Sequence, residues 1–298
     1  MVRIGINPLT WTNDDLPELG EQNSLETCLT EAKQAGYEGV ELGRKFPRDA
    51  AVLGPILKPH GLDLVSGWYS GRLLERSVED EMKAMEAHAN LLRRLNSKVM
   101  VFCEVSRCVH GDRKIPLSKR PKMAEKEWQP FLQKLDQTAA RMKDQGLTMA
   151  YHHHMGTVIQ AEDEVDRMMD STKNVGLLLD SGHLTFAGGD PMRALKRHAK
   201  RIVHVHCKDI RKDKLAQAKK KDLSFLEAVL GDVFAVPGDG SIDFDALLKE
   251  LGRQKYSGWL VVEADQDPAK AHPLTYARLG YANLKRAAES AGFPVDVR

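Results

Sequence analysis

Four side chains of metal-binding types each end a short apolar run of this sequence. They are His152, Asp180, His206 and Glu263, and they follow one another at spacings of 28, 26 and 57 residues. Two imidazoles and two carboxylates form a mixed nitrogen and oxygen ligand set, which suits a divalent transition metal. If the apolar runs are parallel strands of one barrel, their carboxyl ends share the face on which barrel active sites lie. The pattern therefore predicts metal-assisted chemistry at that face rather than a packing role.

The elements that would position these residues alternate short apolar strands with longer amphipathic helices, an order typical of βα units around a parallel sheet. Apolar residues at helical spacing predict helices at Glu79–Leu95 and Trp128–Gln145. Eight such units predict a single (β/α)8 TIM barrel. An open doubly wound sheet is the alternative, but Asn7–Trp11 lacks the glycine-rich loop that a dinucleotide site needs after the first strand. Strands are predicted at Val2–Asn7, Gly39–Leu42, Leu62–Gly67, Lys98–Glu104, Thr148–His153, Val175–Asp180, Ile202–Cys207 and Gly258–Glu263.

The composition is that of one globular domain. Of the 298 residues, 42% are apolar and 29% are charged, and the length is usual for one barrel. We expect a single domain over residues 1–298, with an extended loop near 107–122 and a helical insertion near 212–232. Both stretches are basic. A solvated charged surface explains the second, whereas the first follows the fourth strand on the predicted active-site face and could contact substrate.

Charge, hydropathy and cysteines narrow the choice of partners. With 44 basic and 42 acidic residues, a net charge of +2 predicts no nucleic acid and no anionic membrane as partner. No apolar run approaches the roughly 20 residues that span a bilayer, and Met1–Asn7 is typical of a strand rather than of a signal peptide. The four cysteines lack the paired spacing of metal fingers, so we expect free thiols in a reducing cytoplasm. The sequence leaves open whether the chain forms a homo-oligomer.

Strand alternation decides which histidines can share a face. His152 and His154 fall on one face of their strand, and His153 falls on the other. We expect His152, not His153, to face the metal. A polar strand end without metal is the alternative.

The two carboxylates of the set have specific sequence contexts. Asp180 is followed three residues later by His183, so both lie at one strand end. Asp180 either ligates the metal or caps the next helix, and His183 either contacts substrate or supports a ligand. Glu263 follows four apolar residues, where a lone buried carboxylate would be costly without a cation or hydrogen-bond donors.

Further residues near predicted strand ends could contact the substrate. Glu41 and Glu104, at the ends of the second and fourth strands, could hold hydroxyl groups, with helix capping or a core salt bridge as the alternative. Trp68, at the end of the third strand, could form a wall beside a sugar ring, with core packing as the alternative. Lys208 shares its strand face with His206 and could meet substrate oxygens.

Longer motifs surround these positions: Ile6–Asp14, Tyr151–Thr157, Leu179–His183, His204–Asp209, Val236–Asp243 and Val262–Glu263. They resemble the xylose isomerase-like, endonuclease IV-like TIM barrels, over nearly the whole chain. Within that superfamily, the first two motifs resemble the myo-inosose-2 dehydratases of bacterial inositol catabolism. The resemblance implies a hydro-lyase that depends on manganese or cobalt, with glutathione as an accessory cofactor and a small cyclic polyol ketone as substrate.

One departure from the superfamily pattern bears on the reaction. Isomerases and epimerases of this group usually carry a glutamate where His152 stands, and its replacement removes one of the two carboxylates that an epimerase uses. The resemblance therefore implies loss of water from 2-keto-myo-inositol (scyllo-inosose) through an enediolate, giving a trihydroxycyclohexane-1,2-dione. Glu263 is the expected base, and His154, His183 and Lys208 are candidates for leaving-group acid and oxyanion partner.

Other activities fit the same barrel. A keto-sugar isomerase or epimerase is the first alternative. An endonuclease IV-like phosphodiesterase would need more metal ligands and a positive groove for DNA. A non-enzymatic metal- or polyol-binding protein would close every position around the metal, whereas a catalytic metal keeps one open.

Overall fold

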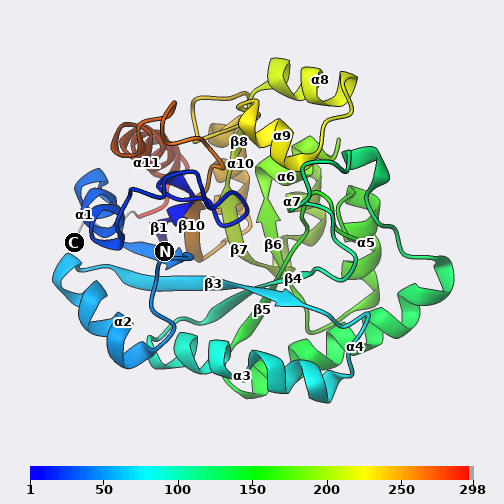
Figure 1. The fold of residues 1–298 in the computed structure, drawn as a ribbon. Helices are drawn as coiled ribbons and strands as arrows, with labels where there is room; N and C mark the ends of the chain where they lie inside the picture. Colours follow the sequence, from blue (N-terminus) through cyan, green and yellow to red (C-terminus); the bar gives the residue numbers. More distant parts are fainter. Residues whose placement is uncertain (295–298) are drawn as a thin grey trace.

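Eight parallel strands close into one barrel with helices around it (Figure 1). The computed structural model describes residues 1–294. The strands are β1 (Val2–Ile6), β2 (Gly39–Leu42), β3 (Asp63–Gly71), β4 (Val99–Glu104), β5 (Thr148–His152), β6 (Gly176–Asp180), β7 (Ile202–Cys207) and β10 (Gly258–Val262). Because β1 pairs with β10, the sheet is closed. The predicted (β/α)8 TIM barrel is confirmed, and the open doubly wound sheet is excluded.

The helices begin and end at residues that suit their termini. In α3 the Ser77 hydroxyl accepts the Asp80 N–H at 3.1 Å, and Arg93 and Arg94 occupy the last turn, where the helix dipole favours cations. Within residues 1–294, no helix is both long and apolar enough to cross a bilayer. The helices are α1 (Leu25–Ala35), α2 (Ala50–Leu57), α3 (Val78–Arg94), α4 (Glu125–Asp144), α5 (Glu162–Ser171), α6 (Ser181–Phe186), α7 (Pro191–His198), α8 (Lys212–Lys220), α9 (Phe225–Leu230), α10 (Phe244–Arg253) and α11 (Pro273–Ser290).

β3 is longer than predicted, because it continues to Gly71 instead of ending at Gly67. The polar residues after Trp68 obscured the strand, yet backbone pairing with β4 continues through them. The buried Glu81 carboxylate of α3 accepts the Arg72 N–H at 2.9 Å and holds this extension. Trp68 therefore lies within β3 rather than at its end.

The barrel interior is apolar in its lower part. Val101, Ala150 and Leu178 form a small cluster on the inner faces of β4, β5 and β6. The main core lies between the strands and the helices and contains Tyr151, the neighbour of Ala150 that points the other way. The interior cluster forms a floor beneath the polar side chains at the carboxyl ends of the strands.

The pairing of β6 with β7 contains an irregularity that places two of the candidate ligands. The register shifts between Leu177 and Leu178, so that one residue of β7 is skipped. As a result Asp180 lies opposite His206. Paired residues of parallel strands project to the same side of the sheet, so both side chains enter the barrel mouth.

An additional unit lies between β7 and α10. It contains the antiparallel pair β8 (Asp209–Ile210) and β9 (Phe234–Ala235), with α8 and α9 above the barrel in Figure 1. The long loop after β4 packs against it, since the Leu117 N–H donates to the Leu223 carbonyl at 3.1 Å. The buried Asp209 carboxylate ties the unit down by accepting, at 2.8–3.1 Å, the backbone N–H groups of Ile210, Gly238, Gly240, Ser241 and Ile242.

Candidate active site

A cavity of about 260 Å³ opens at the carboxyl ends of the barrel strands. It is smaller than the roughly 300–1,000 Å³ of pockets for drug-sized ligands, so its size suits a single-ring molecule. His110 of the loop after β4 reaches its wall, so this loop borders the cavity. Its lining includes Asn7, Glu41, Trp68, His110, His152, His154, His206, Glu263 and Asp265.

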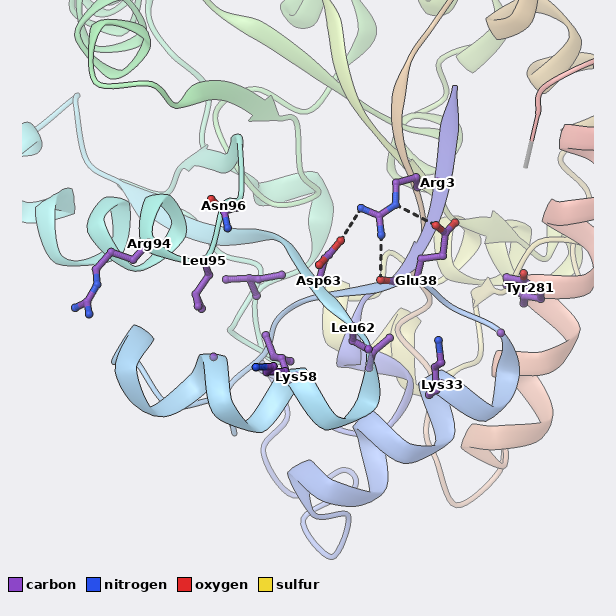
Figure 2. Close-up of a pocket in the computed structure, with 15 residues that line it drawn as sticks. Arg3, Lys33, Glu38, Lys58, Leu62, Asp63, Arg94, Leu95, Asn96 and Tyr281 are labelled. Atoms are coloured by element: carbon purple, nitrogen blue, oxygen red, sulfur yellow. Dashed lines mark hydrogen bonds and ion pairs between the residues drawn. The ribbon is translucent and has the colours of Figure 1, made fainter. Parts of the chain in front are cut away.

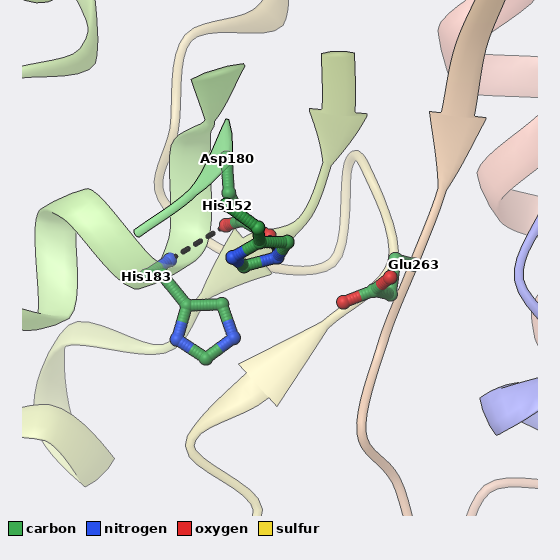
Figure 3. Close-up of side chains that lie close together, drawn as sticks. All are labelled: His152, Asp180, His183 and Glu263. Carbon is green, nitrogen blue, oxygen red and sulfur yellow. Dashed lines mark hydrogen bonds and ion pairs between the residues drawn. The ribbon is translucent and has the colours of Figure 1, made fainter. Parts of the chain in front are cut away.

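Metal-binding atoms converge at the base of this cavity (Figure 3). One ligand atom from each of His152, Asp180, His183 and Glu263 lies within 4.8 Å of the others. His206 Nδ1 lies 2.9 Å from Glu263 Oε2 and 3.5 Å from Asp180 Oδ2. Asp180 Oδ2 and His206 Nδ1 are buried, and neither makes a contact of hydrogen-bonding geometry with the described residues, despite these short distances. Two orphaned polar atoms beside further nitrogen and oxygen ligands fit a divalent cation.

Local hydrogen bonds orient two of these side chains. His152 Nδ1 lies 2.8 Å from the His153 carbonyl, which can only accept, so the lone pair of the ring is on Nε2. That atom lies 3.5 Å from Asp180 Oδ2. Asp180 Oδ1 accepts the His183 N–H at 2.7 Å and caps α6. One carboxylate oxygen thus caps the helix and leaves the other free for a cation.

The charges around His206 favour a cation at its ring. Burial alone would lower the pKa of His206, but the carboxylates of Glu263 and Glu41 raise it well above its usual range. A divalent metal at Nδ1 would meet the same negative field. His206 is therefore in a position to bind metal, whether or not a proton occupies Nδ1 beforehand.

Lys208 is wholly buried and holds Glu263 in place. Its Nζ lies 2.6 Å from Glu263 Oε1, 2.7 Å from Asp265 Oδ2 and 3.1 Å from His183 Nε2. Burial alone would lower the pKa of Lys208, but Asp265 and Glu263 raise it above its usual value. Burial alone would raise the pKa of Glu263, but His206 and Lys208 lower it to about 2. Glu263 is thus held in its charged carboxylate form.

Two residues of this network were missed from the sequence. Asp265 follows Glu263 by two positions, so strand alternation could have placed it on the same face. Asn7 follows β1, and its amide donates to Glu41 Oε2 at 2.7 Å and to Glu263 Oε2 at 2.9 Å. Its place after the first strand was the available signal, but an amide is not one of the metal-binding side-chain types from which the site was predicted.

Burial disfavours the charged form of two further histidines at the site, His154 and His183. Burial lowers the pKa of His154 and of His183 well below the usual range, and Lys208 adds to this effect. His154 lines the cavity, and its Nδ1 lies 2.8 Å from the Met155 carbonyl, so Nε2 carries the lone pair. His153 lies outside the cavity lining, and its Nε2 is 3.5 Å from the Asp180 backbone nitrogen.

Trp68 and Glu104 differ in how they meet the cavity. The Trp68 ring lines it and packs edge-on against His152 and His154, with ring centroids 5.4 and 5.5 Å away. Glu104 is fully buried and accepts the N–H groups of Leu73 and Ser106 at 2.6 and 2.8 Å. Glu104 therefore supports the loops after β3 and β4 and lies outside the cavity lining.

A larger cavity of about 510 Å³ lies at the amino ends of the strands (Figure 2). Its central charges neutralise one another, because Arg3 pairs with Glu38 at 3.0 Å and with Asp63 at 2.7 Å. In β/α barrels the chemistry occurs at the carboxyl ends of the strands, whereas residues at the amino ends contribute to stability. Size alone therefore does not make it the active site.

The fold and the site define a β/α barrel with a candidate divalent-metal centre at the carboxyl ends of its strands. The sequence profile of the xylose isomerase-like TIM barrel family matches residues 29–288. The chain belongs to this family.

Several proteins are similar to this chain in sequence over most of its length. The rhizopine catabolism protein MocC of Rhizobium meliloti is 53% identical over 293 residues, which are 98% of this chain and 90% of that protein. An inosose dehydratase of Clostridium perfringens is 42% identical over 279 residues, which are 93% of this chain and 94% of that protein. Among solved structures, the IolI protein with a bound zinc atom has a TM-score of 0.67 at 18% identity and covers 97% of both chains, which shows the shared fold.

Proposed function

We propose that this chain is a metal-dependent hydro-lyase that removes water from 2-keto-myo-inositol and yields a trihydroxycyclohexane-1,2-dione, a step of inositol catabolism. The observation that carries the proposal is a nitrogen and oxygen ligand cluster at the base of a ring-sized cavity. The 42% identity to inosose dehydratases over 93% of the chain supports the reaction and the substrate class.

The proposed ligands are His152, Asp180, His206 and Glu263. His183 is an alternative to His206, since it belongs to the same cluster. However, the Lys208 ammonium lies 3.1 Å from His183 Nε2, and a cation there would be repelled. His206 Nδ1 has no such neighbour and lies 2.9 Å from Glu263. Manganese or cobalt is the proposed metal, because a set of imidazoles and carboxylates suits both. Glutathione is proposed as an accessory cofactor from the family resemblance alone.

A bound metal would act as a Lewis acid that polarises the ketone and acidifies the neighbouring C–H bond. His154 is the proposed proton acceptor, because it lines the cavity, presents the Nε2 lone pair and is not one of the proposed metal ligands. Glu263, the base expected from the sequence, is less suitable because it is a proposed metal ligand and its other oxygen lies 2.6 Å from the Lys208 ammonium. The C–H bond breaks toward His154, the C–O bond of the β-hydroxyl breaks, and the resulting imidazolium returns a proton to the leaving oxygen. Water leaves, and the enol product ketonises.

The test is incubation of the protein with 2-keto-myo-inositol and Mn²⁺ or Co²⁺ in deuterated water. We expect a product lighter by one water that carries deuterium at the new methylene. Asp180→Ala is the control and should give no product. Recovery of an isomer of unchanged composition would instead assign a keto-sugar isomerase or epimerase. The proposed partner is this small ketone, without nucleic acid or membrane.

A second candidate substrate follows from the higher identity to MocC, which is 53%. It is a cyclic ketone that arises in rhizopine breakdown and undergoes the same elimination. Relative kcat/KM values on the two ketones decide between them.

A further inference from the structure

We infer that Glu41 is a positioning residue that fixes the His206 ring for metal binding, an inference that rests on the metal centre proposed above. Glu41 Oε1 lies 3.2 Å from His206 Nε2. A carboxylate only accepts hydrogen bonds, so the ring carries a proton on Nε2. The lone pair that a metal needs is then on Nδ1, the atom that faces Asp180 and Glu263.

Glu41 can hold this ring because its own position is fixed on every side. Oε1 also accepts from His204 Nε2 at 2.9 Å and from the Ser66 hydroxyl at 2.5 Å. Oε2 accepts from the Asn7 amide at 2.7 Å. Only 3% of Glu41 is exposed, so these contacts lie in a medium where hydrogen bonds to a charged group are strong. The carboxylate is a rigid acceptor rather than a mobile side chain.

The two imidazoles of the proposed centre are therefore oriented by different means. A backbone carbonyl fixes His152, and no substitution can remove it. A side chain fixes His206, so this support can be removed while every proposed ligand stays in place. Partners of this kind typically change metal affinity by about 10–100-fold when they are lost.

Two other roles for Glu41 lead to different measurements. Glu41 lines the cavity and could hold a substrate hydroxyl, although its four hydrogen bonds already match the usual capacity of a carboxylate. With His204 and His206 it also forms a second group of ligand atoms within 4.8 Å of one another, which a second cation could occupy.

The experiment compares Mn²⁺ binding to the parent protein and to Glu41→Gln, by calorimetric titration of metal-free protein without substrate. We expect one Mn²⁺ per chain in both, bound about 10–100-fold more weakly by the variant. The absorption spectrum of the Co²⁺ form should also change, because the neutral amide oxygen of glutamine holds the His206 Nε2–H less strongly than a carboxylate does. Glu81→Gln is the matched control: Glu81 is a wholly buried carboxylate outside the cavity lining and should leave Mn²⁺ affinity unchanged. Circular dichroism and a thermal melt without metal establish that the variants fold.

Each outcome separates the inference from the proposed function. A parent protein that binds neither Mn²⁺ nor Co²⁺ contradicts the metal centre itself. A parent that binds Mn²⁺ together with a Glu41→Gln variant of equal affinity and unchanged Co²⁺ spectrum overturns the role of Glu41, and a raised KM would then assign it to substrate. Two Mn²⁺ in the parent and one in the variant would assign a second cation site instead. If Glu41→Gln does not fold, Glu41→Asp carries the same test, because it keeps the charge but withdraws the oxygen from His206.

Discussion

Replacing Lys208 with methionine should destabilise the protein by leaving two buried carboxylates without their shared cation. Methionine has nearly the length of lysine, so the change removes charge without opening a large cavity. The ammonium lies 2.6 Å from Glu263 and 2.7 Å from Asp265, and the lysine is 0% exposed. Removing one partner of a buried ion pair typically costs about 3–5 kcal/mol. We expect a loss in this range.

The assay is urea unfolding of parent and Lys208→Met with chelator present, so that no metal neutralises Glu263. For a chain of this length, 1 kcal/mol corresponds to about 2 °C of melting temperature. In a thermal melt, the melting temperature should therefore fall by about 6–10 °C. The double variant Lys208→Met with Asp265→Asn should recover part of the loss, because only one uncompensated charge remains. Added Mn²⁺ should recover more, since it would neutralise Glu263.

A decrease in the free energy of unfolding of less than about 1 kcal/mol, with an unchanged slope of this free energy against urea concentration, would refute this reasoning. It would mean that the desolvation of the ammonium cancels its attraction to the two carboxylates. A double variant that is less stable than Lys208→Met alone would also contradict it, because removing one of the two uncompensated charges should recover stability.

Three further results are expected. His152→Ala should abolish binding of Mn²⁺, whereas His153→Ala should cost mainly stability, and equal metal retention by both in a titration would contradict the strand register. Asp209→Ala removes an acceptor of five backbone N–H groups. The donors left unsatisfied should lower the free energy of unfolding by about 2–4 kcal/mol. A decrease of less than about 0.5 kcal/mol would show that water replaces the carboxylate. Gly156→Ala introduces a Cβ 2.8 Å from the His110 backbone nitrogen at a φ of +79°. It should displace the loop that carries His110 and so raise KM, and it should lower the free energy of unfolding by about 1 kcal/mol. Unchanged kinetics would show that this loop does not shape the cavity.

The barrel could be predicted because its strands are apolar where they are buried on both faces. The end of β3 could not, because Tyr69 and Ser70 interrupt the apolar run while backbone pairing with β4 continues. Sheet pairing is a property of two strands, and a polar segment can continue it when an external group such as Glu81 satisfies the next backbone N–H.

The candidate site could be predicted in its residue types more than in its connections. Strand ends indicated which side chains meet at the barrel mouth, but Glu104 shows that a strand end does not determine orientation, because neighbouring backbone N–H groups captured its carboxylate. The partners of Lys208 were also beyond reach. Which carboxylate an ammonium contacts depends on distances across the barrel, and no local pattern encodes them.

The skipped residue in the pairing of β6 with β7 decides which changes of chain length this centre would tolerate. Val203 is the residue of β7 without a partner in β6, so its deletion would restore regular pairing and leave His206 opposite Asp180. Deletion of Val205 would instead keep the irregularity and bring Cys207 opposite Asp180, so that a thiol would replace an imidazole at the mouth. Homologues or libraries that shorten this strand should therefore keep the centre when the skipped residue is lost, and lose the centre when a residue after it is removed.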